Sequence, residues 1–490
     1  MRERVFMCVL ERAIKTGKAA MDNTFEYHGD GFCHEWEQAE TLAEEAFGLY
    51  EKGQMQEAFE KLTLAIQKGP ENAAWFFNMA LTLDGMEHYE QAITCYEKAL
   101  DVLPDDAEIM NCLGVDYTRT AQYDLALATF ERIELIDPSF EPAYCNRIIT
   151  YTEMEQHDKA EQMFYLAQQI HSDCPLCFYN IGNSLFSRGV YERAIWCWEK
   201  TAALDPGHPQ INFRLAQAYW VCGKGRQARQ AFLKEIRKNP ADLDVLLEFG
   251  IFQLESGDLD AAKEKFNRIL EFEPDFAAAR FYLGEVYRLG GDSEAAAKQY
   301  RAALSGDGQL AGPRFRLAQI LQRQGQTDPA IVLLKAECRL EVQDVDVLVA
   351  MGGMFTQMND SENAAKCFLQ ALDLEHEDPR AFSGLGVALA LRGEYAGGRQ
   401  CLEQSLRLHD NDPKTLLHAA WMCCQLEDWE AAGVYAARSQ SLSGSREPYR
   451  SACKSIEKEI RRNSGEQTYA RFLTHHVSGL LKRAGIRLFR

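Results

Sequence analysis

The 490-residue sequence has no long apolar run, a deficit of positive charge and none of the common catalytic motifs. No uninterrupted apolar stretch approaches the ~18 residues that a membrane-spanning helix needs. The formal net charge of −20 argues against general nucleic-acid binding, because such proteins neutralise phosphates with Lys and Arg. The first residues, MRERVFMCVLERAIKTGKAAMDN, contain only a short apolar segment broken by charges, so they make a poor secretory signal.

Glycine-rich phosphate loops, serine nucleophile elbows and HExxH pairs are also absent from the sequence. Each of these motifs places a reactive group or a phosphate-binding backbone at a fixed spacing. We therefore expect no catalytic residues, no metal and no cofactor in this chain.

The fifteen cysteines fall mostly at core or flank positions of predicted helices. Cysteines at the same position of successive repeats seldom have disulfide geometry, so we expect them to be reduced and the protein to be cytoplasmic. Cys174-Pro-Leu-Cys177 has the spacing of a redox or zinc half-site, and Pro175 places Cys174 near the start of a helix. A structural zinc site needs a second pair of ligands, which the sequence does not reveal.

What the sequence does contain is a unit of 34 residues. Over 73 to 106 it reads AAWFFNMALTLDGMEHYEQAITCYEKALDVLPDD. Apolar residues recur at i, i+3, i+4 and i+7 from Phe76, and a second apolar stripe begins at Ala92. The unit therefore predicts two amphipathic helices joined by Glu87 and His88.

Two columns of small residues repeat at this spacing. Eleven of the twelve residues in the first column are Gly or Ala: Ala46, Ala80, Gly114, Ile148, Gly182, Ala216, Gly250, Gly284, Ala318, Gly352, Gly386 and Ala420. The second column runs from Ala58 to Ala432 and contains only Ala and Gly. A bulky column follows it by four residues, as at Phe130, Trp198 and Phe266. Small residues let helix backbones approach, and we expect the bulky residues to fill the gap to the next hairpin.

This pattern resembles the tetratricopeptide repeat family, in which small residues occupy positions 8 and 20 of a 34-residue helix-turn-helix. The resemblance covers residues 39–446. It implies an all-α, right-handed superhelical solenoid that presents a groove to other proteins. Pro70, Pro104 and Pro138 separate early units, whereas Asp378-Pro379 and Asp412-Pro413 predict capped helix starts later on.

The repeats define three regions. Residues 1–38 form an extension in which we expect a short helix over 1–20 and a loop over 21–35. Within the solenoid of 39–446, the sequence SGDGQLAGP at 305–313 indicates either a flexible joint or an ordinary loop in a continuous stack. In 447–490, Ala452, Ile456 and Ile460 predict a capping helix. The basic amphipathic tail beyond it can contact a membrane surface or a partner, but we favour its folding back on the acidic solenoid.

The predicted binding residues lie at positions 5, 6, 9 and 12 of the unit, roughly opposite the packed stripe at ~100° per residue. Rings supply apolar burial there, while amides and guanidinium groups bind a peptide's backbone and carboxylates. These candidates for the concave face are Phe77, Asn78, Asn146, Tyr179, Asn180, Asn183, Phe186, Phe213, Arg214, Gln217, Trp220, Phe281, Arg288, Phe315 and Arg316.

The sequence thus predicts a non-enzymatic scaffold or adaptor that binds extended segments of partner proteins. A second hypothesis is an accessory arm that delivers a bound protein to a catalytic subunit on another chain, for example a glycosyltransferase. A third, less favoured, is a cysteine-based metal or redox protein.

Overall fold

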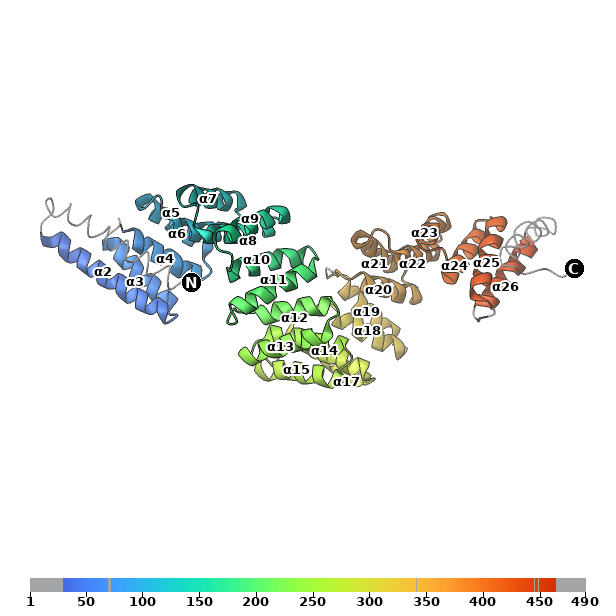
Figure 1. Ribbon diagram of the computed structural model, residues 1–490. Helices are drawn as coiled ribbons and strands as arrows, with labels where there is room; N and C mark the ends of the chain where they lie inside the picture. Colours follow the sequence, from blue (N-terminus) through green and yellow to red (C-terminus); the bar gives the residue numbers. More distant parts are fainter. Residues whose placement is uncertain (1–29, 69–71, 341, 445, 448, 464–490) are drawn as a thin grey trace. The chain divides into compact units, whose positions relative to one another are not determined.

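The computed structural model describes residues 30–463 except 69–71, 341, 445 and 448, and the predicted helix at 1–20 and the basic tail after 463 lie outside this part of the chain. The described residues are helical with no strand, and the helices follow one another as hairpins (Figure 1). The chain divides into two compact units, residues up to Val245 and residues from Leu246 onward. The predicted stack of helical hairpins is confirmed within each unit.

The first unit contains six hairpins. Their helices are α2 (Asp30–Glu51), α3 (Met55–Lys68), α4 (Ala73–Gly85), α5 (Tyr89–Val102), α6 (Ala107–Arg119), α7 (Tyr123–Ile136), α8 (Glu141–Glu153), α9 (His157–Ile170), α10 (Pro175–Ser187), α11 (Tyr191–Leu204), α12 (Ile211–Val221) and α13 (Gly225–Lys238). The boundary between the units falls inside the next helix, α14 (Leu243–Glu255).

The second unit continues with the same alternation. Its further helices are α15 (Leu259–Phe272), α16 (Ala277–Leu289), α17 (Ser293–Gly306), α18 (Pro313–Arg323), α19 (Thr327–Glu337), α20 (Val345–Gln357), α21 (Ser361–Leu374), α22 (Pro379–Leu391), α23 (Tyr395–Leu408), α24 (Pro413–Gln425), α25 (Trp429–Ser443) and α26 (Tyr449–Asn463).

The two small columns lie where the sequence placed them, but the bulky column packs differently from our expectation. A Cβ on Gly114 would come within 2.5 Å of Phe130 Cε1, and one on Gly250 equally close to Phe266 Cε1. Each ring therefore covers the small residue of its own hairpin rather than only the gap to the next one. The reason is that a glycine leaves a hollow the size of a ring edge on the facing helix.

The turn inside each hairpin repeats as strictly as the core. One residue in every hairpin of the described chain has a positive φ, from Gly53 to Glu427 at intervals of 34 residues. Seven of these twelve residues are glycines, which adopt this conformation without a steric penalty. This fixed turn geometry keeps the two helices of each hairpin in the same register from one hairpin to the next.

The first helix of the described chain, α2, begins within a predicted loop, and the last, α26, lies where a capping helix was predicted. Helix α2 begins at Asp30, so the prediction of a loop is wrong for residues 30–35, and the rest of that predicted loop lies outside the described residues. Trp36, near the predicted start of the first hairpin, packs on Trp75 with ring centroids 5.1 Å apart. The capping helix is confirmed as α26, where Cys453, Ile456 and Ile460 are buried, the last two packing against residues of α24 and α25.

The expected helix starts at the later prolines are also confirmed. Asp378 is the N-cap of α22 and accepts hydrogen bonds from the backbone N–H groups of Arg380 and Ala381. Asp412 caps α24 in the same way, with Pro413 as the first helical residue. Burial alone would raise the pKa of Asp378, but hydrogen bonds from Arg380 and the helix N–H groups hold it below its ordinary value.

Candidate partner-binding surfaces

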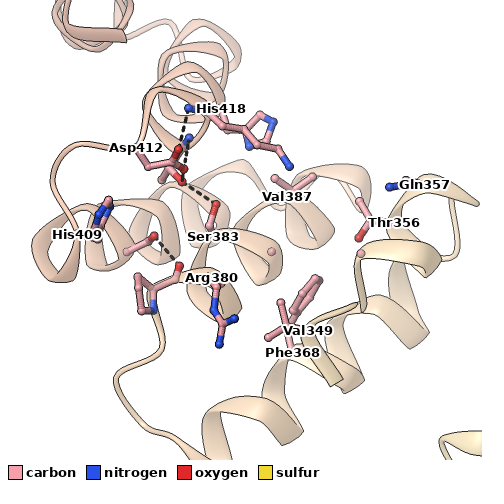
Figure 2. Close-up of a pocket in the computed structure, with 16 residues that line it drawn as sticks. Val349, Thr356, Gln357, Phe368, Arg380, Ser383, Val387, His409, Asp412 and His418 are labelled. Atoms are coloured by element: carbon pink, nitrogen blue, oxygen red, sulfur yellow. Dashed lines mark hydrogen bonds between the residues drawn. The ribbon is translucent and has the colours of Figure 1, made fainter. Parts of the chain in front are cut away.

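A cavity of about 810 Å³ lies on the first helices of three consecutive hairpins of the second unit, α20, α22 and α24 (Figure 2). Seven of its lining residues occupy the repeat positions that were predicted to face the groove: Val349, Gly353, Thr356, Ser383, Gly384, Val387 and His418. Gln357, Arg380, Lys414 and Thr415 also line it, from other positions of the same helices.

Small side chains open this space. Nothing lies within 4 Å of where a Cβ on Gly353 would stand, so this glycine faces open space. Gly384 instead sits directly on the Phe368 ring, which forms part of the wall. On another part of the wall, the Ser383 and Thr415 hydroxyls are 2.8 Å apart, and the Thr415 hydroxyl donates to Asp412 at 2.5 Å. The cavity thus combines a hydrogen-bonded side with an apolar one.

The charged groups around the cavity are partly neutralised by neighbours. Arg380 pairs with Asp378 at 2.6 Å and with Asp346 at 2.5 Å. Burial, aided by Lys414, lowers the pKa of His418 to about 4, so this imidazole is neutral at pH 7. A segment bound here would therefore meet a neutral imidazole beside one lysine and one paired arginine.

The predicted surface of the first unit lies on α10 and α12. The Tyr179 ring stacks near His208, with centroids 4.3 Å apart. Phe186 lies between Tyr191 and Trp198, at 5.2 and 5.5 Å. These contacts hold the partly exposed rings of α10 in fixed positions.

On α12, Arg214 donates to Gln217 at 3.3 Å, and the Trp220 ring packs edgewise on Phe232. Arg214, Gln217 and Trp220 are all partly exposed. The combination of an indole with a guanidinium and an amide on one helix is the arrangement expected for a peptide-binding face.

The fifteen predicted binding residues separate by burial. Ten are partly exposed: Asn146, Tyr179, Asn183, Phe186, Arg214, Gln217, Trp220, Phe281, Arg288 and Arg316. Five are buried: Phe77, Asn78, Asn180, Phe213 and Phe315. The buried rings pack inside the repeats, as Phe77 does on Tyr96 with centroids 5.8 Å apart, so they present no ring surface to a partner.

Two of the predicted cations belong to a carboxylate network in the second unit. Glu285 is buried and accepts from Tyr300 at 2.5 Å and from Arg288 at 2.8 Å. Arg316 Nε reaches the same carboxylate at 3.0 Å. Arg288 and Glu285 both belong to α16, so the ion pair of Arg316 with Glu285 is the contact that links α18 to α16.

The cavity was not predicted from the sequence, although part of its lining lies at the expected positions of the repeat. The predicted binding residues are rings, amides and guanidinium groups, whereas Gly353, Ser383 and Gly384 line this cavity with small side chains. Small residues at positions 5, 6 or 9 of two successive 34-residue repeats were the sequence signal that could have predicted this cavity.

The cysteines of α8 and α10 correct the expectation that all thiols are reduced. Cys145 and Cys177 form a disulfide, with Cα atoms 5.3 Å apart. They occupy different positions of successive repeats, so the argument from same-position cysteines did not apply to them. Cys174 is the N-cap of α10, as predicted, and its sulfur accepts from the Cys177 N–H at 3.3 Å.

Comparisons with known proteins agree with this architecture. A tetratricopeptide repeat model matches residues 77–139, 247–311 and 355–413, and a model of YpiA-like C-terminal tetratricopeptide repeats matches 209–275. The hairpins within these ranges are tetratricopeptide repeats. Among the described residues, no helix has the length and apolarity needed to cross a bilayer.

Similar proteins share only part of their length with this chain. The TPR repeat-containing protein YpiA of Bacillus subtilis is 23% identical over 250 residues, which are 50% of this chain and 58% of YpiA. The human protein O-mannosyl-transferase TMTC1 is 24% identical over 204 residues, 40% of this chain and 22% of TMTC1. The chain therefore spans less than two thirds of either relative.

Solved structures were similar at low sequence identity. The Cut9–Hcn1 hetero-tetramer of APC/C has a TM-score of 0.39 at 15% identity, covering 86% of this chain and 96% of that one. Yeast Tom70 has a TM-score of 0.37 at 15% identity, covering 89% and 99%.

Proposed function

We propose that this chain is a non-enzymatic, cytoplasmic scaffold that binds extended segments of partner proteins on the first helices of its repeats. The cavity over α20, α22 and α24 carries the proposal. It offers Val349 and Val387 for apolar side chains, and Gln357 and Lys414 for polar groups of a peptide. The acidic body of the chain supports protein partners rather than nucleic acid.

A test should fill the cavity without disturbing the fold. Gly353→Trp points its side chain into open space, so it should leave the melting temperature nearly unchanged. We expect it to weaken capture of partners by at least tenfold, about 1.4 kcal/mol. Immobilised chain would be incubated with cell extract, and the retained proteins quantified by mass spectrometry and then titrated individually.

Gly353→Ala is the matched control, because a methyl group leaves most of the cavity open. It should retain the partners of the unaltered chain. If Gly353→Trp still captures the same proteins with the same affinity, the cavity is not a binding site and this part of the proposal fails.

The second hypothesis, an accessory arm for an enzyme on another chain, is supported by the similarity to TMTC1, whose name describes a protein O-mannosyl-transferase. The same capture experiment separates the two hypotheses. Recovery of a stoichiometric transferase subunit would favour the arm, whereas a set of non-enzymatic partners would favour the scaffold.

A further inference from the structure

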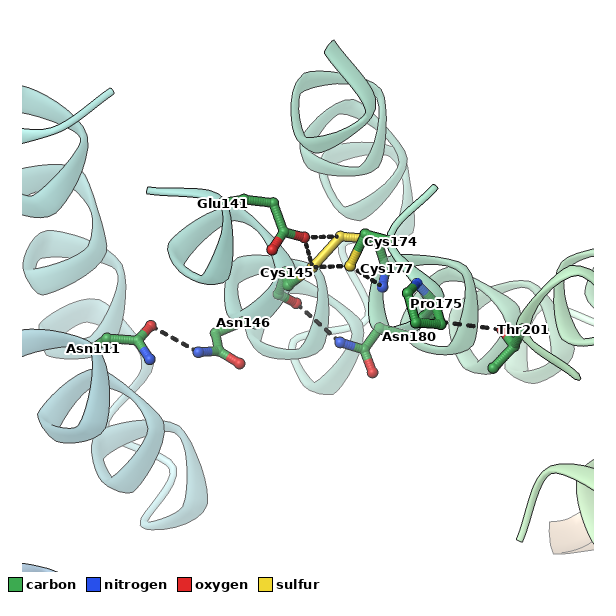
Figure 3. Close-up of a disulfide and its surroundings, with 9 residues drawn as sticks. All are labelled: Asn111, Glu141, Cys145, Asn146, Cys174, Pro175, Cys177, Asn180 and Thr201. Carbon is green, nitrogen blue, oxygen red and sulfur yellow. Dashed lines mark hydrogen bonds between the residues drawn. A yellow bond between two sulfur atoms is a disulfide. The ribbon is translucent and has the colours of Figure 1, made fainter. Parts of the chain in front are cut away.

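Four possible metal ligands meet between α8 and the start of α10 (Figure 3). Glu141 is the first residue of α8, and Cys145 follows one turn later. Cys174 and Cys177 come from the N-cap and first turn of α10. Their ligand atoms all lie within 4.8 Å of one another, and the three cysteines are buried.

One sulfur–sulfur distance matches a tetrahedral zinc site, and the other ligand atoms must separate when the Cys145–Cys177 disulfide is reduced. The sulfurs of Cys145 and Cys174 are 3.8 Å apart. Ligands at the usual zinc–sulfur distance of about 2.3 Å from a tetrahedral centre lie roughly 3.8 Å from each other. Glu141 Oε1 lies 2.7 Å from the Cys145 sulfur and 2.9 Å from the Cys177 sulfur.

We propose that Glu141, Cys145, Cys174 and Cys177 bind a zinc ion when the cysteines are reduced. Three thiolates are soft ligands that select zinc over magnesium or calcium, and a carboxylate can complete four-coordination. In the disulfide state, the Cys174 thiol is hydrogen-bonded to the Glu141 carboxylate, whereas the Cys145 and Cys177 sulfurs beside it carry no hydrogen to donate. After reduction, a cation shared by the carboxylate and the three thiolates would satisfy all four groups at once.

The surroundings hold the ligands in place. The Cys177 N–H donates to the Cys174 sulfur at 3.3 Å, which fixes the position of this sulfur at the helix start. Asn180 Nδ2 donates to the Cys145 carbonyl at 3.2 Å, tying α10 to α8 beside the site. Outer contacts of this kind orient ligands in metal sites.

Zinc binding and the Cys145–Cys177 disulfide are mutually exclusive states of the same sulfurs. On zinc binding, each thiol loses its proton to solvent. On oxidation by a peroxide, the two thiolates give up two electrons and form the S–S bond. The O–O bond of the peroxide breaks and yields two hydroxide ions. The zinc ion, now held only by Cys174 and Glu141, exchanges these ligands for water and leaves the protein.

The test uses the full chain, reduced with a phosphine, freed of metal with a chelator and then dialysed against zinc. We expect one tightly bound zinc per chain by elemental analysis. Cobalt in place of zinc should give an intense sulfur-to-cobalt charge-transfer band. Treatment with hydrogen peroxide should release the zinc as the disulfide forms.

Single variants assign the ligands. Cys174→Ser leaves both disulfide sulfurs intact but should weaken zinc binding at least tenfold, and Glu141→Gln should do the same while preserving shape. The control is Cys338→Ser, because Cys338 and Cys367 also place two sulfurs 3.5 Å apart but belong to no cluster of three or more ligands among the described residues.

Three results would overturn the proposal. One is reduced chain that retains no zinc and gives no sulfur-to-cobalt band. Another is a zinc affinity that Cys174→Ser and Glu141→Gln leave unchanged. The third is loss of zinc in Cys338→Ser with full retention in Cys174→Ser, which would place the metal elsewhere. Circular dichroism of each variant distinguishes loss of the ligand from loss of the fold.

Discussion

Gly250 on α14 has no room for a side chain, because the Phe266 ring of α15 lies where a Cβ would stand. Gly250→Leu must push the two helices of this hairpin apart or expel the ring. Overpacking of this kind costs about 1–3 kcal/mol or more. We expect a lower midpoint of urea unfolding and a lower melting temperature than for the unaltered chain.

Gly353→Leu is the control for this prediction. Gly353 also lies in the middle of a first helix, but a side chain there meets nothing within 4 Å. Its stability should change little, since leucine also has the higher helix propensity. Equal destabilisation by the two substitutions would contradict the packing argument.

Asp116 on α6 is a buried carboxyl that titrates near neutral pH. Burial, then repulsion from Asp84, raises its pKa to about 7, against the opposing effect of Arg119 at 3.0 Å. Between about pH 4 and 7 the folded chain therefore holds a proton that the unfolded chain has lost. This group makes the free energy of unfolding fall as the pH rises through that window.

Asp116→Asn should remove this contribution. We expect the variant to gain stability relative to the unaltered chain on going from pH 5 to pH 8, by on the order of 1–3 kcal/mol. Urea unfolding of both proteins at the two pH values measures the difference. An offset that does not change with pH would show that Asp116 is ionised throughout.

Single residues also show what the sequence could and could not reveal. The small columns were predictable because every unit obeys the same close-packing requirement. The partners of Cys174 and Cys177 were not, because Glu141 and Cys145 lie about one repeat earlier at other positions of the unit. Only the stacking of α10 on α8 brings them together.

At the scale of helices, the connection from α17 to α18 is still predicted to be either a flexible joint or an ordinary loop in a continuous stack, and proteolysis tests the first alternative. Residues 305–309 are exposed, and Gly312 has a φ of +104°. Glu337, a buried carboxylate, accepts from the Gly312 N–H and anchors this end of the segment. We expect limited proteolysis to cut first within 305–313, after any trimming of the termini.

Glu337→Ala should speed this cleavage several-fold, because it removes the anchor and leaves the Gly312 N–H without its partner. Gel electrophoresis with mass spectrometry of the fragments would locate the cuts. First cuts between α19 and α20, with 305–313 resistant, would instead place the weak point where α19 ends early. That helix has 11 residues, whereas α17 and α21 have 14 each.

At the scale of the whole molecule, the repeat predicts the fold far better than the binding sites. Every unit must bury its apolar stripe on a neighbour, so the core columns follow from the sequence alone. A binding surface depends on which side chains of a column are absent, as at Gly353, and on which charges neutralise each other, as at Glu285. Those features need the structure.

If the chain is a bridging scaffold, each of its two compact units should have its own partner-binding surface. Trp220→Ala with Arg214→Glu removes an aromatic anchor and reverses a charge on α12. A single buried anchor commonly contributes ~2 kcal/mol or more, so capture by this surface should weaken at least ~30-fold. Helical content and melting temperature should stay nearly the same, because both residues are partly exposed.

This double variant and Gly353→Trp should each lose a different set of partners from the same extract, because they alter surfaces on different units. Cys338→Ser serves as a control that should lose neither set. When a partner of one surface is used as bait, the unaltered chain should bridge it to a partner of the other surface. Neither variant should form this bridge. If the double variant keeps every partner, α12 is not a binding surface. If both variants lose the same partners, the two surfaces are not independent, and the chain acts as a single-site adaptor rather than a bridging scaffold.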